Sequence, residues 1–367
     1  MRNKINYAGP WITSKEVEYV KEAVVNGFYE NYKLHARKLE DTLCRVLGVK
    51  YALATNACTA ALHLAVASLG IKSGDEVITS DSSCVASAMC IAYVGATAVF
   101  VDVDPETWCL SPYAVRKAIT PKTKAILPVH WNGHPAAMDE IMAIAKEYRL
   151  HVIEDGAPSL GAKFRTQKVG TIGDVGCFSF QGAKVAIGGQ GGVLVTDNPQ
   201  IYETAQTLAS YGRTDSVMQY WSDHLGWNYT MPNLPAALAL AQVERLEELI
   251  AKKRQIFRWY QDGLEGWEGV KLIEEAKGTM STYCYPALLI RDNVRRSREE
   301  VLADLRQDNI DCRPAQPRIS RMPMFQSRFS NTESERVETR GVILSSAFNL
   351  NEDDVAFVCK RLIALTR

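Results

Sequence analysis

Between residues 51 and 196, short apolar runs alternate with segments of helical character, and this alternation constrains the fold more than any other feature of the chain. Several runs are apolar at every position, as expected for strands that are covered on both faces. Repetition of strand, helix and strand predicts an α/β fold with a mostly parallel sheet sandwiched by helices. The seven expected strands lie at 51–56, 76–81, 98–104, 125–131, 151–156, 175–180 and 191–196, and helices are expected at 59–70, 111–120 and 138–150.

The last two apolar runs are too close together to leave room for a crossover helix. Parallel neighbours need such a crossover, so we expect this pair to be joined directly by the loop that contains Lys184. Lysine is a costly residue to hold near a core. Its place between two apolar runs therefore raises the question of its function.

The pattern changes after about residue 230, where residues 235–264 are predicted to form one long helix. The length of the chain suggests two domains. We expect a large domain at 1–245 and a small α+β domain at 246–367, which begins with the linking helix. The other expected elements are a helix at 13–27 that starts with a capping box of Thr13 and Glu16, a strand at 283–290, and helices at 297–309 and 352–366.

The totals exclude several classes of function. Lys+Arg and Asp+Glu both number 42, so no basic excess favours binding to nucleic acid or to an anionic membrane surface. No apolar run is long enough to span a bilayer, and the first residues lack the core of a signal peptide. The nine cysteines form no CxxC pair, and we expect no metal site. An odd number of cysteines without a signal peptide indicates reduced thiols and a cytoplasmic location.

Three features with reactive or ligand-binding side chains follow expected strands. In open α/β sheets, ligands bind beyond the carboxyl ends of the strands. The turn before Thr59 opens a helix whose free N–H groups, together with the Thr59 hydroxyl, could hold a phosphate. Glu154 and Asp155 end an apolar run, and a buried carboxylate there needs a partner. The segment "FSFQGAK" supplies Ser179 and Lys184.

A phosphate cradle, a carboxylate and a lysine on one rim suggest pyridoxal phosphate. The lysine would form the Schiff base to the aldehyde, and the carboxylate would keep the pyridine nitrogen protonated so that the ring acts as an electron sink. Each feature alone has a structural alternative. Lys184 is also typical of a solvated loop lysine, Asp155 of a structural cap, and Thr59 of ordinary helix capping.

Long stretches of the chain resemble the DegT/DnrJ/EryC1/StrS family of aminotransferases, and the resemblance runs from about residue 6 to the C-terminus. It implies a fold-type-I pyridoxal-phosphate enzyme and a homodimer whose active sites are shared between subunits. The motifs that carry it are "NACTAALHLAVASLGIKSGDEVI" (56–78), "YVGATAVFVDVDPETW" (93–108), "AITPKTKAILPVHWNGHPAAMDEI" (118–141), "VIEDGAPSLGA" (152–162), "GDVGCFSFQGAK" (173–184), "GGQGGVLVTD" (188–197) and "LGWNYTMPNLPAALALAQVERL" (225–246).

The resemblance implies a role for each matching residue. Lys184 matches the Schiff-base lysine, and Asp155 matches the partner of the pyridine nitrogen. The phosphate contacts match the backbone of Cys58 and the side chains of Thr59 and Ser179, and Asn228 matches an asparagine lent by the neighbouring subunit.

The resemblance also implies a reaction. Family members take an amino group, usually from glutamate or glutamine, and pass it to a carbonyl of a keto-sugar, mostly nucleotide-linked, in a ping-pong cycle. Lys184 would be the base that moves the proton. A dehydratase branch of the family has histidine at this position, so the lysine favours transamination.

Four positions depart from the family's usual pattern. Cys84 stands where an aromatic residue usually stacks on the pyridine ring, and a thiol cannot stack in that way. Pro158 stands near the cofactor's phenolic oxygen, where the family often has a polar side chain. Gln190 replaces an acidic residue in the loop after the lysine, and Thr230 replaces a basic residue after Asn228. These four changes bear on the choice of substrate and on the affinity for the cofactor.

Contacts with the substrate are expected from aromatic and basic residues, although core or rim packing is an alternative for each. Other acceptors, a keto-cyclitol or a keto-octulosonate, remain open, as do a sugar dehydratase and a non-catalytic homologue. The candidates for contacting the substrate are His130, Trp131, Tyr211, Arg213, Trp227 and Arg313.

Overall fold

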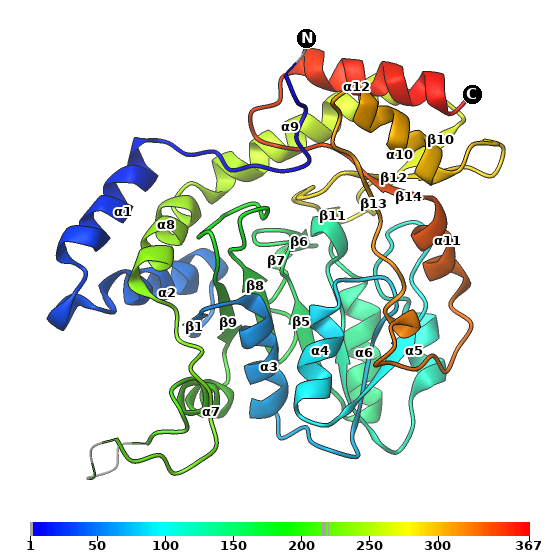
Figure 1. Cartoon of the computed structure of the whole chain (residues 1–367). Coiled ribbons are helices and arrows are strands. Elements are labelled where there is room, and N and C mark those ends of the chain that lie inside the picture. The colour runs from blue at the N-terminus through cyan, green and yellow to red at the C-terminus, as the bar shows by residue number, and fades with distance from the viewer. Residues whose placement is uncertain (1–2, 215–217, 219) are drawn as a thin grey trace.

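The computed structural model describes residues 3–214, 218 and 220–367, and a seven-stranded sheet forms its centre (Figure 1). The strand order is β1-β9-β8-β5-β4-β2-β3. All seven predicted strands are therefore confirmed, and they lie in one sheet. Their bounds are β1 Tyr51–Thr55, β2 Glu76–Ser80, β3 Thr97–Val101, β4 Thr123–Leu127, β5 His151–Asp155, β8 Val175–Ser179 and β9 Gly192–Thr196.

The direction of the strands follows the prediction as well. Strands β3, β2, β4, β5 and β8 run parallel to one another. Strand β9 is antiparallel to both of its neighbours, β8 and β1. No helix lies between β8 and β9, so the loop that contains Lys184 joins them directly, as expected from the short gap.

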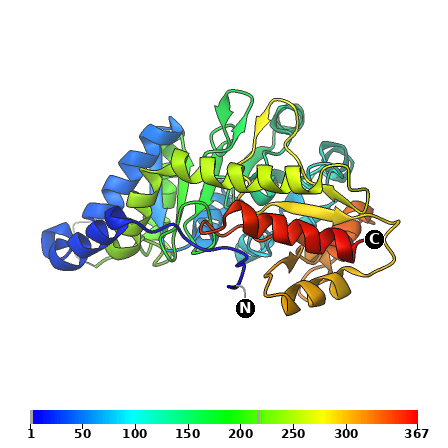
Figure 2. The same ribbon diagram turned by 90° about the horizontal axis from the view of Figure 1, so that it is seen from above.

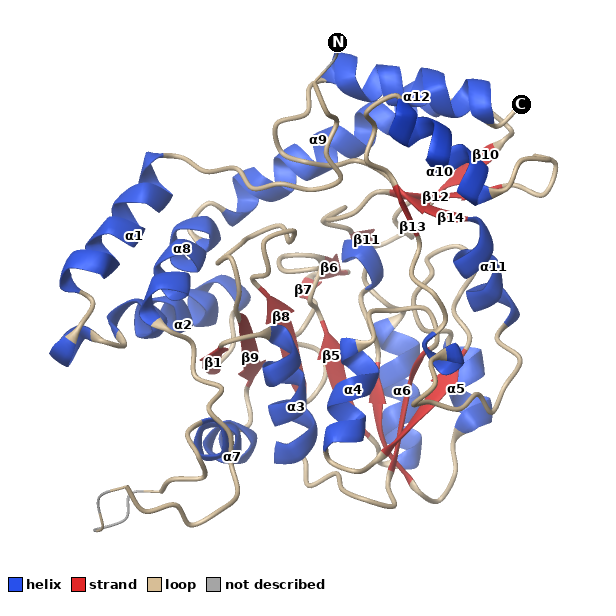
Figure 3. Cartoon of the chain, in the orientation of Figure 1, coloured by secondary structure: helices blue, strands red, loops and turns tan. Residues whose placement is uncertain are grey.

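Helices cover both faces of the sheet, which explains why its strands are apolar at every position. In β9, Leu194 belongs to the core under α3, α4 and α7, whereas Val193 and Val195 belong to the core under α2, α5, α6 and α8. Figure 3 shows these two helical layers around the strands. Their bounds are α2 Leu34–Leu47, α3 Cys58–Ser68, α4 Ala86–Tyr93, α5 Pro112–Ala118, α6 Met138–Tyr148, α7 Pro199–Ala209 and α8 Asn233–Val243.

The C-terminal part forms a smaller α+β unit with its own core. That core includes Ile256 of α9, Leu288 of β12, Leu305 of α10 and Leu362 of α12. Figure 2 shows α9 and α12 side by side across this unit. Its antiparallel sheet has the order β10-β12-β14-β13. The bounds are α9 Leu246–Leu264, α10 Arg298–Gln307, α11 Thr332–Arg340, α12 Glu352–Leu365, β10 Val270–Leu272, β12 Ala287–Ile290, β13 Arg313–Pro314 and β14 Gly341–Ile343.

The predicted single helix at 235–264 is wrong, because the chain forms two helices, α8 and α9, with a break at Arg245. The Arg245 backbone leaves the helical region at φ −113° and ψ 16°. Its guanidinium contacts Glu16 at 2.7 Å and the Trp11 carbonyl at 3.5 Å. This anchoring to the N-terminal segment is a long-range contact, which helical periodicity does not contain.

The predicted strand at 283–290 is shorter than expected, because β12 begins only at Ala287. Tyr283 has a φ of 47°, which is incompatible with a strand. Pro286 offers no N–H group to a neighbouring strand. Three short strands that were not predicted, β6 Lys163–Phe164, β7 Gln167–Lys168 and β11 Thr279–Met280, form a separate small sheet.

The N-terminal helix α1, Ser14–Asn26, begins as predicted. The Glu16 carboxylate accepts the Thr13 backbone N–H at 2.7 Å, as the capping box requires. Across the described ranges, the structure has no helix with the length and apolarity needed to cross a bilayer.

Candidate active site

A cavity of about 260 Å³ lies beyond the carboxyl ends of β4 and β5, between the large sheet and the smaller unit. Asp155 ends β5, and Lys184 comes from the loop between β8 and β9. The remaining wall comes from the N-terminal segment and from the smaller unit. The lining residues are Tyr7, Ser83, Cys84, Val129, Trp131, Asn132, Asp155, Ala157, Pro158, Lys184, Tyr285, Arg313, Pro314, Gln316 and Ile343.

Asp155 is buried at the bottom of this cavity and is held by two hydrogen bonds. Its Oδ2 accepts a bond from the Ser87 hydroxyl at 2.7 Å, and its Oδ1 accepts one from the Ala157 N–H at 3.0 Å. Both bonds fix the orientation of the carboxyl group. The Asp155 side chain therefore has a defined position in the wall of the cavity.

Glu154 precedes Asp155 but serves a different purpose. Successive side chains of a strand point to opposite faces, and Glu154 does not line the cavity. Its carboxylate accepts three backbone N–H groups at 2.6–2.7 Å, from Gly170, Ile172 and Gly173. Glu154 therefore anchors the loop before β8.

His130 is a partner of Glu154 and does not line the cavity, so its contact with the substrate stays a prediction. The ring is fully buried, and Nε2 lies 2.9 Å from the Glu154 carboxylate. Nδ1 accepts the Ala136 N–H at 3.0 Å, so Nε2 carries the hydrogen that is donated to Glu154. Both nitrogens are thus engaged by the protein, and the sequence did not reveal this because the partners come from other segments.

Lys184 lies on a loop that is held by backbone hydrogen bonds, and its amine lies over an aromatic ring. The Phe180 N–H donates to the Gly191 carbonyl at 2.9 Å, and the Lys184 N–H donates to the Gln181 carbonyl at 2.9 Å. Lys184 Nζ lies 5.2 Å from the centre of the Tyr285 ring, a distance typical of a cation–π contact. Tyr285 in turn stacks on Tyr7, with ring centres 5.1 Å apart. The amine of the half-buried Lys184 therefore has a defined position in the cavity.

The beginning of α3 has the properties of an anion site. Its N-cap is Ala57, which has no side chain to accept the first N–H groups, and the structure shows no side-chain cap. A Cβ on Gly192 of β9 would lie 2.5 Å from the Cys58 nitrogen, so only glycine allows this close approach. Burial and the Asp155 charge raise the pKa of the Cys58 thiol well above its usual value, which places Cys58 within electrostatic range of the cavity.

The donor set fits pyridoxal phosphate. Lys184 and Asp155 share one cavity, and the uncapped start of α3 lies close to it. Thr59 belongs to the first turn of α3, and Ser179 ends β8, the strand before the lysine loop. None of Cys58, Thr59 and Ser179 lines the cavity itself.

Several predicted contacts lie outside this cavity within the single chain. Trp227 packs on the ring of His63, with centres 4.2 Å apart, and burial lowers the pKa of His63 to about 4. Tyr211 is exposed, and the Arg213 guanidinium lies 5.1 Å from its ring. Asn228 is exposed as well, and its carbonyl accepts a bond from the Asn56 amide at 3.0 Å.

Trp131 and Arg313 line the cavity, and their contact with the substrate stays a prediction. The Arg313 guanidinium lies over the Tyr7 ring at 4.6 Å and pairs with Asp311 at 3.3 Å. Trp131 is nearly fully buried and meets Trp108 edge to face. Both residues therefore have a packing role beside any contact with a ligand.

The four unusual positions differ in their relation to the cavity. Cys84, with its thiol side chain, and Pro158 form part of its wall. Gln190 is exposed in the loop after the lysine, and Thr230 forms a backbone bridge with Thr55 at the end of β1. Within the single chain, Cys84 and Pro158 are therefore the two of these four residues that face what the cavity binds.

The sequence did not indicate several residues of the cavity wall. Tyr7 and Tyr285 belong to segments far apart along the chain, and no local pattern joins them. Asn132 carried a detectable signal, because Asn-Gly directly after the predicted strand 125–131 indicates a turn with unusual backbone angles. Ser87 carried none, since one serine at the start of a helix is ordinary.

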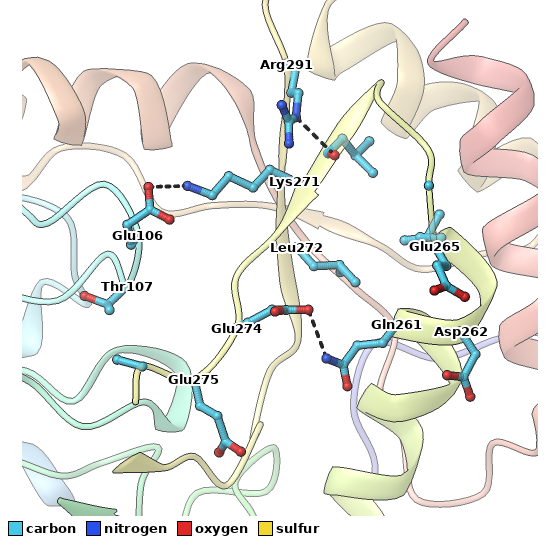
Figure 4. A pocket seen from close by; sticks show the side chains of 14 residues that line it. Glu106, Thr107, Gln261, Asp262, Glu265, Lys271, Leu272, Glu274, Glu275 and Arg291 are labelled. Atoms are coloured by element: carbon cyan, nitrogen blue, oxygen red, sulfur yellow. Dashed lines mark hydrogen bonds and ion pairs between the residues drawn. The ribbon is translucent and has the colours of Figure 1, made fainter. Parts of the chain in front are cut away.

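A second cavity, of about 690 Å³, lies at the junction of residues 106–107 with the smaller unit (Figure 4). It shares no lining residue with the cavity of Lys184 among the described parts of the chain. Carboxylates dominate its wall, and Lys271 is paired with Glu106 at 2.6 Å. An acidic wall repels phosphate groups, so this cavity is unsuited to the cofactor.

Comparisons with known proteins agree with this arrangement. The family model of the DegT/DnrJ/EryC1/StrS aminotransferases matches residues 10–363. The chain is 36% identical over 354 residues to GDP-perosamine synthase of Escherichia coli O157:H7, with 96% of each chain covered. It is 32% identical over 377 residues to EpsN of Bacillus subtilis (strain 168), which is assigned as a pyridoxal phosphate-dependent aminotransferase, with 100% of this chain and 96% of EpsN covered.

A solved structure has the same fold. The crystal structure of DesI in the presence of its TDP-sugar product superposes with a TM-score of 0.91 at 25% identity, and it covers 100% of this chain and 94% of DesI. The similarity extends over both the large sheet and the smaller unit. The cavity therefore lies in a fold that is known to carry a nucleotide-linked sugar in another protein.

Proposed function

Since the chain belongs to the DegT/DnrJ/EryC1/StrS aminotransferase family, it is a pyridoxal phosphate-dependent aminotransferase, and we propose that its acceptor is a nucleotide-linked keto-sugar. We further propose that glutamate or glutamine is the donor and that the two half-reactions follow a ping-pong order. The observation that carries the proposal is the presence of Lys184 and Asp155 in one cavity.

The choice of acceptor rests on the relatives. The name of GDP-perosamine synthase contains a nucleotide-linked sugar, and the DesI crystals hold a TDP-sugar product. Arg313 supports this choice, because a guanidinium at the cavity wall suits the phosphate oxygens or hydroxyl groups of such a ligand. A keto-cyclitol or a keto-octulosonate is the alternative acceptor.

The residues of the chain take complementary parts in the proposed reaction. When bound, pyridoxal phosphate supplies an electron sink and carries the amino group between donor and acceptor. Lys184 would hold it covalently through Nζ and, once released, would move the proton at the donor's Cα. Asp155 would keep a proton on the ring nitrogen, and the free N–H groups of α3 would bind the phosphate.

We also propose a homodimer in which Asn228 of one subunit completes the site of the other. The exposed position of Asn228 supports this, because its side chain is free to reach a neighbouring copy. Apolar side chains of Val24, Val25 and Phe28 are exposed near the end of α1. Exposure of these apolar side chains to water is unfavourable, and contact with a second subunit would bury them.

The proposal is tested by the visible spectrum of the protein after loading with pyridoxal phosphate. We expect an absorption band that is lost on addition of glutamate or glutamine and that is absent in Lys184→Ala. Lys184→Arg is the matched control, since it keeps the charge but should not restore the band. Absence of a donor response in the wild-type protein would contradict the proposal.

The acceptor is then identified by the mass of the product. Incubation of the donor-treated protein with a panel of nucleotide-linked keto-sugars, keto-cyclitols and keto-octulosonates should yield an amine from the first class. A product that has instead lost water would indicate a dehydratase.

A further inference from the structure

Lys253 of α9 is a buried basic residue outside the candidate active site. Its side chain is 1% exposed and does not line the cavity of Lys184. Burial lowers the pKa of the Lys253 amine to about 8, so the amine is mostly protonated at neutral pH. Its hydrogen-bond partners in the described part of the chain include no carboxylate. A charge that is buried without an opposite charge is costly, which raises the question of what this amine holds.

The amine of Lys253 joins two segments from other parts of the chain. Nζ donates to the Cys284 carbonyl at 3.2 Å, to the Ser346 carbonyl at 2.5 Å and to the Ser346 hydroxyl at 3.1 Å. A protonated amine has three hydrogens, and these three acceptors can use all of them. Nζ also lies 4.8 Å from the centre of the Phe348 ring, whose face favours a cation. These contacts offset part of the cost of burial and hold the two segments together.

Ser346 extends this junction to the N-terminal segment. Its backbone N–H donates to the Tyr7 carbonyl at 2.8 Å, and its hydroxyl lies 3.3 Å from the same oxygen. Cys284 directly precedes Tyr285 in the chain. Lys253 therefore holds the backbone next to Tyr285 directly, and it holds the backbone of Tyr7 through Ser346.

Tyr7 and Tyr285 form a stacked pair in the wall of the cavity. Their ring centres lie 5.1 Å apart, and their planes differ by 10°. Lys184 Nζ lies 5.2 Å from the centre of the Tyr285 ring, and the Arg313 guanidinium lies 4.6 Å from the centre of the Tyr7 ring. All four residues line the cavity. A shift of either ring would therefore disturb the basic side chain that lies on it.

We propose that Lys253 is a positioning residue of the candidate active site, which sets the Tyr285 and Tyr7 rings by holding the backbones of their segments. The inference rests on the proposed function, in which this cavity binds pyridoxal phosphate. An apolar side chain of similar length would fill the same space with less desolvation, so stability alone does not account for a lysine at this position.

The test compares three variants of α9. Lys253→Met removes the amine and keeps an unbranched side chain of similar length, and Lys253→Arg keeps the charge and several donors. Tyr260→Phe is the matched control, because Tyr260 is also fully buried on α9 and donates from its hydroxyl to the Ser345 carbonyl at 2.8 Å. This control removes a buried hydrogen bond from the same helix and leaves the amine of Lys253 in place.

The first measurement is the dissociation constant of pyridoxal phosphate without substrate, followed by visible absorption. We expect Lys253→Met to raise this constant about tenfold, because the hydrogen bonds that fix the cavity wall are lost. Lys253→Arg should restore it to within about threefold of wild type, and Tyr260→Phe should leave it within about twofold. Thermal unfolding without cofactor shows whether Lys253→Met and Tyr260→Phe lose stability to a similar degree.

The second measurement shows whether Lys253 acts through Tyr285. In a Tyr285→Leu background, Lys253→Met should change the dissociation constant by less than about threefold, because the ring that Lys253 positions, and on which Tyr7 stacks, is then absent. A larger change in this background would show that Lys253 affects the cofactor by another route and would overturn the inference.

A dissociation constant within about twofold of wild type in Lys253→Met would also overturn the inference. An equal rise in Tyr260→Phe would do the same, because it would assign the effect to a general loss of stability.

If Lys253→Met does not fold, Ser346→Ala takes its place, because it removes one of the three contacts of the amine. It should raise the constant about threefold, and an unchanged constant would count against the inference. Failure of the proposed function has a different signature, because then the wild-type protein itself shows no cofactor band or no donor response.

Discussion

At the scale of single residues, hydrogen bonds from neighbouring side chains orient the carboxylate of Asp155. The Ser87 hydroxyl donates to it, so the second bond of Ser87, to the Ser83 hydroxyl at 3.3 Å, must be one in which Ser83 donates. Ser83 lines the cavity, and Ser87 is fully buried. A chain of two hydroxyl groups therefore runs from the cavity wall to Asp155, and it orients the carboxylate.

Removal of this positioning hydroxyl should weaken cofactor binding. In Ser87→Ala, Asp155 loses a hydrogen bond to a charged group, which is worth about 1.5–3 kcal/mol. We expect the dissociation constant of pyridoxal phosphate to rise about tenfold and the pH dependence of its visible band to shift. A cofactor titration of the purified protein measures both effects, and Ser87→Thr should restore them. Wild-type values of both quantities in Ser87→Ala would show that the hydroxyl has no such role.

Glu40 on α2 has an unusual charge state that the structure explains. Its carboxyl accepts the Ala54 N–H at 2.8 Å, yet burial raises its pKa from 4.5 to about 7, with a further contribution from the charge of Asp41. The folded state thus favours the protonated acid. This contribution to stability is fully present below pH 4.5 and is lost as the pH rises through 7.

Glu40→Gln should remove this dependence, because the amide resembles the protonated acid and still offers an oxygen to Ala54. At pH 8 we expect the variant to be more stable than wild type by up to about 3 kcal/mol, since one pKa unit corresponds to about 1.4 kcal/mol. Near pH 5 the difference should largely vanish. Denaturant unfolding of both proteins at the two pH values tests this. A less stable Glu40→Gln at pH 8 would contradict the expectation.

At the scale of elements, the smaller unit is joined to the large sheet by a helix cap supplied from another element. The side chain of Asn331, the N-cap of α11, does not cap the helix. Asp102, directly after β3, accepts the Glu333 N–H at 3.0 Å and the Ser334 N–H at 2.8 Å. A carboxylate at this end also complements the helix dipole. One residue thereby ties α11 to the edge of the sheet.

Asp102→Ala should destabilise the protein by about 1–2 kcal/mol, the usual cost of losing an N-terminal cap. Asp102→Asn keeps one acceptor oxygen and should lose less. The urea midpoint of unfolding measures both variants. An unchanged midpoint in Asp102→Ala would show that water replaces the cap without cost.

The success of the sequence predictions also differs between elements. The strands of the large sheet were predicted because burial on two faces leaves continuous apolar runs such as that of β9. Helix α2 was missed, although Leu39, Leu43 and Leu47 repeat at the spacing of a buried helical face. The hairpin of β6 and β7 has two residues in each strand, which is too short for any period to be detected.

At the scale of the whole molecule, the proposed sharing of sites means that one chain alone lacks a complete active site. This makes a prediction about mixed dimers. Asn228 does not line the cavity of its own chain, whereas Lys184 does. If Asn228 acts across the interface, Lys184→Ala and Asn228→Ala subunits complement each other. In a mixed dimer, the site built on the intact Lys184 then receives Asn228 from the partner.

Unfolding and refolding an equal mixture of the two inactive variants should therefore restore about a quarter of the wild-type activity. About half of the randomly formed dimers are mixed, and in each mixed dimer one of the two sites is complete. Each variant refolded alone is the control. Recovery of no activity in the mixture, with dimers confirmed by light scattering, would place Asn228 within its own subunit or outside the site.

By itself, the sequence determined the α/β architecture, the order of the strands along the chain and the pair of Lys184 and Asp155, because periodicity, turn residues and side-chain chemistry are local properties. Only the tertiary structure decided which side chains meet. It paired His130 with Glu154, brought Tyr7 onto Tyr285, and placed Asp102 at the start of α11. These contacts join segments that are distant in sequence, and they depend on the spatial order of strands and on the docking of the smaller unit, which no local pattern contains.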